Sequence, residues 1–300
     1  MFKQILVPLD GSKLAEATLP AAASLAQTLK APVTLLHIIE QDAPAEVHRD
    51  RHLTKPDEAE AYLKEIASRA FPTKVKVGTH VHTAPVADVA RSIVEHATQE
   101  FQPDLIILCA HGNSGMRELI FGNIAQQVVA ASGTPVLLIK PDEVSTPFQM
   151  KRILVPLDNE SLHDGVLPTA VKLAKAYGAQ LDLLCVIPTP STDSGEHAAS
   201  GTMLPMTAAA YLDIAEEIAG EHFQTHLDEF LKAGISATAE IARGDPAPVI
   251  AKTAERFDAD LILFGTHGRA GLDAFWNRSV TAAVAHRTKI PLLLVPVRER

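Results

Sequence analysis

The sequence contains two copies of a glycine-bearing loop suited to binding an anion. One lies within residues 104–139 and the other within residues 260–295, and each follows a short apolar run typical of a strand buried on both faces. Asn123 and Ser279 stand where each loop leads into a helical apolar pattern, so we expect them to be helix N-caps. Such a turn gathers free backbone N–H groups that suit a phosphate. The loop glycines are Gly112, Gly115, Gly122, Gly265 and Gly268.

A second pair of chemically capable residues ends the first strand of each half. KQILVPLD, ending at Asp10, recurs as KRILVPLD, ending at Asp158. Proline removes a ladder hydrogen bond, so we expect the strands to end near Pro8 and Pro156. The aspartates then lie at the carboxyl end of a parallel sheet, where open α/β folds bind ligands.

The elements that must position these residues alternate between strand and helix in both halves. This βαβα order predicts an α/β fold with a parallel sheet, right-handed crossovers and helices on both faces. A repeat of this length indicates duplicated domains rather than short stacked units. We predict one domain over residues 1–141, a linker over 142–150 and a second domain over 151–300.

Composition excludes several classes of function. The chain has 300 residues, 47% of them hydrophobic, which supplies two cores. A formal net charge of −9 and 5% aromatic residues disfavour nucleic-acid binding. No apolar run is long enough for a membrane span, and the N-terminus lacks the pattern of a signal peptide. With only two cysteines, the expected location is the cytoplasm.

At these residues the chain resembles a tandem universal stress protein, over nearly its whole length. That family has an adenine-nucleotide motif, Gly-x2-Gly-x9-Gly-Ser/Thr, after the fourth strand. In the first copy Cys109 replaces the first glycine and Asn123 replaces Ser/Thr, whereas Gly112 and Gly122 match. In the second copy Gly265, Gly268 and Ser279 match, and Arg278 replaces the third glycine.

The resemblance implies two Rossmann-like domains of the adenine nucleotide alpha hydrolase type. Each would hold a five-stranded parallel sheet, and the two would form a pseudo-dimer in which the last strands, 136–139 and 292–295, pair. It implies that Asp10 or Asp158 meets the adenine–ribose portion and that Ile38 or Val186 flanks the base. Pro8 belongs to the same expected site.

The resemblance also implies a stress-response sensor or regulator that binds ATP, ADP or AMP, with or without Mg²⁺, as a single tandem chain or as a homodimer. The first copy is the more favourable site, because Cys109 is small whereas Arg278 could fill the second site or pair with a phosphate. Against this, Gly244-Asp245-Pro246 keeps a Gly-x-Pro of the family that Thr83-Ala84-Pro85 has lost. Two alternatives are an interaction scaffold with decayed sites and slow ATP hydrolysis. Since there is no P-loop, an efficient ATPase is not expected.

Other residues invite chemistry but are more simply explained. We predict no catalytic residue at His111 or His267, because no partner acid or nucleophile stands at a recognisable spacing. We predict no metal site at three histidine pairs, because none has an H-E-x-x-H arrangement. The cysteines should behave as small hydrophobes, with redox sensing by Cys109 the alternative. Core packing is expected for the apolar residues between positions 211 and 231. The histidine pairs are His48/His52, His80/His82 and His222/His226.

Overall fold

A computed structural model describes residues 2–48, 50–110, 122–141, 147–158, 163–189, 205–267 and 279–297. These residues form two compact units. Unit 1 holds residues up to 149 together with 291–296, and unit 2 holds 150–266 together with 279–290. Within the described ranges, no helix is long and apolar enough to span a membrane.

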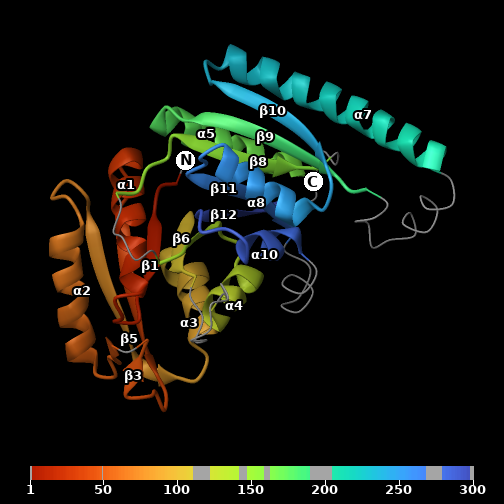
Figure 1. Ribbon diagram of the computed structural model, residues 1–300. Coiled ribbons are helices and arrows are strands. Elements are labelled where there is room, and N and C mark those ends of the chain that lie inside the picture. The colour runs from red at the N-terminus through yellow and green to blue at the C-terminus, as the bar shows by residue number, and fades with distance from the viewer. Residues whose placement is uncertain are drawn as a thin grey trace. The chain divides into compact units, whose positions relative to one another are not determined.

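Unit 1 is built on a parallel sheet with the strand order β5-β2-β1-β6-β7 (Figure 1). Its inner strands are apolar and buried on both faces, as the short apolar runs predicted. The strands are β1 (Ile5–Pro8), β2 (Val33–Glu40), β5 (Val77–Val86), β6 (Leu105–Cys109) and β7 (Val136–Ile139).

The helices of unit 1 pack in two groups, α1 with α2 and α3 with α4. They lie on opposite sides of β1 (Figure 1). Proline stands at the first or second position of α1 and α2, where its missing N–H costs no hydrogen bond. The helical elements are η1 (Ala15–Thr18), α1 (Leu19–Leu29), α2 (Pro56–Ala70), α3 (Val89–Glu95), the π-helical η2 (His96–Phe101) and α4 (Asn123–Ala131).

One element of unit 1 was not predicted. Between β2 and α2 the chain forms a small antiparallel hairpin of β3 (Glu46–Val47) and β4 (Asp50–Arg51). Two residues per strand are too few for a hydrophobic period to show in the sequence.

Unit 2 repeats the arrangement with the parallel order β10-β9-β8-β11. Helices α5 and α7 pack on these strands, and α8 contacts α10. The elements are β8 (Arg152–Leu157), η3 (His163–Val166), α5 (Leu167–Tyr177), β9 (Gln180–Ile187), α7 (Pro205–Lys232), β10 (Ala237–Arg243), α8 (Pro246–Arg256), β11 (Leu261–His267) and α10 (Val280–Ala285).

The internal repeat extends to single hydrogen bonds. Asp104 Oδ2 accepts from the backbone N–H groups of Lys3 and Gln4, at 2.7 and 3.1 Å. Asp260 Oδ2 accepts likewise from Lys151 and Arg152, at 2.6 and 2.9 Å. In each half the carboxylate satisfies the backbone N–H groups just before or at the start of the first strand, so this aspartate and its two hydrogen bonds are part of the internal repeat.

The predicted α/β class, with five strands from each half of the sequence, is confirmed. The strand over 292–295, β12 (Leu292–Val297), pairs antiparallel with β7 through Leu292↔Leu138 and Leu294↔Val136. The predicted pairing of the last strands is therefore confirmed, and it covers an apolar edge of unit 1.

The predicted packing of α7 is only half right. Phe223 and Phe230 are buried, but Ile214 and Ile218 are 56% and 52% exposed. Apolar residues at helical spacing indicate a helix face, and they do not show that the face is covered.

Candidate functional site

A cavity of about 480 Å³ opens at the carboxyl ends of β1, β2 and β6 in unit 1. This is the edge at which parallel sheets bind ligands. The volume falls within the range of sites for small molecules. The cavity brings together five residues that the sequence analysis selected, namely Pro8, Asp10, Ile38, Gly122 and Asn123.

Most of the remaining cavity wall is apolar, with a few polar groups among it. Apolar side chains of β2, α3, β6 and α4 suit a flat aromatic base, and carboxylates and imidazoles can meet hydroxyl groups. The apolar lining includes Val47, Val89, Ile93, Leu108 and Ile124, and the polar lining includes Glu40, His37, His48 and His52.

Asp10 is held in a tight turn by its own neighbour. Its Oδ1 accepts from the N–H and the Oγ of the buried Ser12, at 2.8 and 2.7 Å. Its Oδ2 lies 3.7 Å from Nε2 of His48. Gly11, which stands between Asp10 and Ser12, has φ +91, and a Cβ at this position would lie 2.8 Å from the side chain of Leu53. The turn therefore requires glycine, and it fixes one carboxylate oxygen while the other faces the cavity wall.

The unpredicted hairpin places two histidines on the cavity. His48 has φ +52 in the turn between β3 and β4, so the interpretation of His48 and His52 as one turn of a helix is wrong. His52 is buried, its Nε2 lies 3.7 Å from Glu40 Oε2, and its Nδ1 has no hydrogen-bond partner in the described part of the chain. No spacing rule could place these residues beside Asp10.

His37, on β2, connects the loop after β1, which we call the rim loop (residues 9–12), to the segment that follows the hairpin. Its ring lies between two carbonyl oxygens, with Nδ1 2.8 Å from Leu9 O and Nε2 3.0 Å from Leu53 O. Both partners accept, so at least one ring N–H donates across this buried contact. The bond fixes the orientation of β2 just before Ile38 enters the cavity wall.

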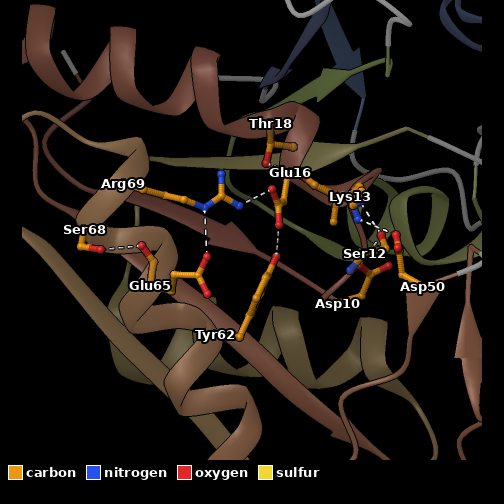
Figure 2. A network of polar contacts seen from close by, with 11 residues as sticks. Asp10, Ser12, Lys13, Glu16, Thr18, Asp50, Tyr62, Glu65, Ser68 and Arg69 are labelled. Carbon is orange, nitrogen blue, oxygen red and sulfur yellow. Dashed lines mark hydrogen bonds and ion pairs between the residues drawn. The ribbon is translucent and has the colours of Figure 1, made fainter.

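A polar network anchors α2 to the helix that follows Asp10 (Figure 2). Glu16 of η1 accepts from Tyr62 Oη at 3.4 Å and from Arg69 Nη2 at 2.5 Å. Asp50 Oδ2 accepts from the backbone N–H of Lys13 at 2.8 Å. Burial, followed by the charge of Glu16, raises the pKa of Tyr62, so its hydroxyl remains a donor. The network holds the hairpin and α2 against the rim loop.

The N-terminus of α4 faces the cavity, but its cap differs from the prediction. Gly122 is the N-cap and Asn123 is the first helical residue, with its Oδ1 accepting from Gln127 Nε2 at 2.8 Å. Gly122 has φ −60 and ψ 143, a conformation open to any residue. Its role here is therefore to leave space, and not to permit a special turn. Ile124, the next residue of the helix, is 44% exposed and lines the cavity.

In unit 2 the counterparts occupy corresponding strand ends. Asp158 follows β8, Val186 lies in β9, Gly265 lies in β11 and Ser279 is the N-cap of α10, with no side-chain capping bond. Gly244, at the end of β10, has φ +142, so its glycine is required by the backbone.

Several predicted residues lie outside the described ranges, including one of the two loop histidines. They are Gly112, Gly115, Gly268 and Arg278, with His111 beside them. For His267 only the strand position is described.

Neither cysteine has the surroundings of a reactive thiol. Burial, and then the negative charge of Asp10, raise the pKa of Cys109. Burial, followed by the charge of Asp158, raises the pKa of Cys185 to about 11. At neutral pH both remain thiols, which fits the interpretation as small hydrophobes.

All three histidine pairs gain acidic neighbours, and two of them contribute to clusters of three potential metal ligands. On α7, His222 and His226 meet Asp164 of η3. In unit 1, His80 meets His96 and Glu100. Asp164 belongs to a different element from His222 and His226, and Glu100 to a different element from His80, so the spacing of the histidine pairs carried no signal for either acid.

Comparison with known proteins gives one consistent family. A model of the universal stress protein family matches residues 1–140 and 150–296. The universal stress protein Rv2623 of Mycobacterium tuberculosis is 24% identical over 97% of this chain and 95% of its own. The single-domain universal stress protein Sll1388 of Synechocystis is 28% identical over 48% of this chain and 96% of its own.

Solved structures show the same fold. The crystal structure of a universal stress protein from Archaeoglobus fulgidus superposes with a TM-score of 0.69 at 19% identity, covering 99% of this chain and 97% of that chain. A putative universal stress protein from Pseudomonas aeruginosa gives the same score at 19% identity, covering 99% and 94%. With both halves matched by the family model, the chain belongs to the universal stress protein family, with two such domains in tandem.

Proposed function

We propose that the cavity of unit 1 binds an adenine nucleotide, ATP or its di- or monophosphate, and that the chain acts as a nucleotide-responsive regulator. The observation that carries the proposal is the convergence of Asp10, Ile38, Gly122 and Asn123 on one cavity from three separate places in the fold, namely the end of β1, β2 and the start of α4. The resemblance to the nucleotide motif selected the same residues without reference to the cavity.

The chemistry of the wall suggests how the nucleotide would lie. Ile38, Ile93 and Leu108 offer an apolar slot for the base. Asp10, whose other oxygen is occupied by Ser12, offers Oδ2 to a ribose hydroxyl. The N-terminus of α4, behind Gly122, offers backbone N–H groups to the phosphates.

We test the proposal with two matched substitutions. Asp10→Asn keeps the Oδ1 acceptor that orders the turn, but replaces Oδ2 with a donor. Asp158→Asn makes the same change in unit 2. A hydrogen bond to a charged group contributes about 1.5–3 kcal/mol, so Asp10→Asn should weaken ATP binding about 10- to 100-fold. Asp158→Asn should leave the unit 1 affinity unchanged.

The assay is calorimetric titration of nucleotide-free protein with ATP and Mg²⁺, with released phosphate followed in the same samples. One bound equivalent with no turnover supports a sensor, and steady phosphate release supports a slow ATPase. Loss of binding in Asp158→Asn alone would move the site to unit 2. No heat from any protein at millimolar ATP would refute nucleotide binding.

A second substitution probes the phosphate end. Gly122 has backbone angles that valine adopts without strain, so Gly122→Val should fold with an unchanged melting temperature. Its side chain would occupy the approach to the helix N-terminus. We expect ATP to lose more affinity than AMP, because only the longer phosphate chain needs that approach.

The second candidate function is an interaction scaffold. The observation that favours it is the exposed apolar row Tyr211, Ile214 and Ile218 on α7, at 61%, 56% and 52% exposure. A protein that binds no nucleotide and loses self-association or partner binding on Ile214→Ser/Ile218→Ser would support this function instead.

A further inference from the structure

Three potential metal ligands converge in unit 2, and none of them was assigned to nucleotide binding. His222 Nε2 lies 2.8 Å from Asp164 Oδ2, and His226 Nε2 lies 3.3 Å from the same oxygen. The two Nε2 atoms are 3.1 Å apart. Three ligand-type atoms from two elements therefore surround one point.

The fold fixes the directions of these side chains. His222 and His226 are four positions apart on α7, so they project from the same face of the helix. Phe223 and Phe230 are buried on the inner side of α7, which sets the rotation of the helix. The His226 ring stacks on Phe230, with centroids 6.3 Å apart and planes 20° apart. The helix is thus locked with both imidazoles facing η3.

Hydrogen bonding alone does not satisfy this cluster. Asp164 Oδ1 and His226 Nδ1 are both buried and have no hydrogen-bond partner in the described part of the chain. If both Nε2 atoms carry hydrogens and donate to Oδ2, these hydrogens crowd each other, because the two nitrogens are only 3.1 Å apart. A cation at the centre would accept a lone pair from all three atoms and relieve this conflict.

The donor set indicates which kind of cation would fit. Two imidazole nitrogens and one carboxylate match the ligands of zinc and related first-row metals, which leave a fourth position for water. Calcium and magnesium prefer oxygen ligands throughout. Glu229 Oε2 lies 3.8 Å from His226 Nδ1, on the side where metal-bound histidines commonly have an outer carboxylate.

We propose that Asp164, His222 and His226 bind one divalent transition-metal ion, with Zn²⁺ as the representative. The ion joins the start of α5, through η3, to the middle of α7. Binding at this position stabilises the docking of α7, the long helix in Figure 1, and requires no nucleotide.

The histidine cluster of unit 1 supplies an internal control. His96 uses Nδ1 toward Glu100 Oε2 at 2.9 Å and Nε2 toward His82 Nδ1 at 3.1 Å. Glu100 is exposed, and none of these side chains has a buried polar atom that lacks a partner. That cluster is satisfied by its own hydrogen bonds, so we expect weaker metal binding there.

The test is metal titration of tag-free, chelator-stripped, nucleotide-free protein. We expect one tight equivalent of Zn²⁺ by competition with a chromophoric chelator, and a visible absorption band typical of low-coordinate Co²⁺. We also expect a rise in melting temperature with Zn²⁺ and none with Mg²⁺. Failure of ATP binding would not affect these results, so the two proposals fail separately.

Substitutions assign the ligands. Asp164→Asn, His222→Gln and His226→Gln should each weaken Zn²⁺ binding by more than the roughly 10- to 100-fold that loss of an outer-shell partner costs. His80→Gln/His96→Gln should leave it unchanged. Circular dichroism confirms that each variant is folded. Tight binding that survives His222→Gln/His226→Gln, or wild-type protein with no equivalent tighter than millimolar, would overturn the proposal.

Discussion

The buried carboxylate of Asp182 gives the sharpest test of how unit 2 is held together. Asp182 lies in β9 with 0% exposure and accepts two bonds from Arg152 of β8, from Nε and Nη2, each at 3.0 Å. Gln180 Nε2 and Thr238 Oγ1 donate to it at 2.7 and 2.6 Å. The informative change is Arg152→Met, which keeps an unbranched apolar chain as far as the position of Nε and removes the guanidinium charge.

The loss of stability expected for Arg152→Met depends on the hydrogen bonds and the solvent exposure that Asp182 keeps when the guanidinium is removed. Breaking a buried ion pair and stranding a charge costs about 3–5 kcal/mol. Two neutral donors still reach Asp182, and the Arg152 side chain is 33% exposed, so solvent screens part of the pair. We therefore expect Arg152→Met to lower the free energy of unfolding of unit 2 by about 2–3 kcal/mol.

The assay is urea unfolding followed by circular dichroism, with Arg243→Met as the matched control. Arg243 also pairs with two carboxylates, Asp213 and Glu216, but on an exposed surface, so its loss should change the midpoint little. Equal midpoints for the two variants would refute the reasoning, since they would show that burial of the Asp182 charge has no energetic consequence.

Two further predictions concern the loop at the cavity rim and the two cysteines. Gly11→Ala should destabilise unit 1 by about 1–2 kcal/mol, because alanine is strained at positive φ. It should also weaken ATP binding, because the added methyl group pushes Leu53 and the hairpin away from Asp10. Thermal melting measures the first effect and ATP titration the second. Alkylation by iodoacetamide should be slow for both cysteines at pH 8, because burial raises the pKa of Cys109 and of Cys185. Cys185 should become reactive only near its pKa of about 11. Fast labelling of either cysteine at pH 8 would contradict this prediction.

The strands of the sheets could be predicted because burial on both faces produces short, uninterrupted runs of apolar residues in the sequence. Runs such as Leu105–Leu108 have no polar position, and only a covered parallel strand accommodates that pattern. The rim position of Asp10 follows from the same strand. The cavity itself could not be predicted, because His48 and His52 of its polar wall come from a hairpin segment that is held by the bond from Lys13 N–H to Asp50, a contact that depends on tertiary structure.

Helix ends and helix faces were predicted less well, for a different reason. Asn123 has a side chain that suits an N-cap, yet the N-cap of α4 is Gly122, one residue earlier, and Asn123 is the first residue of the helix. Capping preference is a weak local term that loop geometry overrides. On α7, Ile214 and Phe223 have equal apolar character, and only packing decides that one is exposed and the other buried.

The cavity also changes how the motif departures should be weighed. By the motif alone, unit 1 has lost more than unit 2, because Cys109, Asn123 and Thr83 depart from the family pattern in unit 1 whereas Arg278 alone departs from it in unit 2. In the structure β5 continues to Val86, whose carbonyl accepts from Gln41 N–H at 2.8 Å, so the chain after β2 turns toward the hairpin that closes the cavity. In unit 2 the corresponding strand stops at Arg243, and Gly244 takes φ +142. The loss of that glycine therefore accompanies the construction of the cavity wall. Retention of a family motif letter by letter is a poor measure of a ligand site when residues outside the motif enclose it.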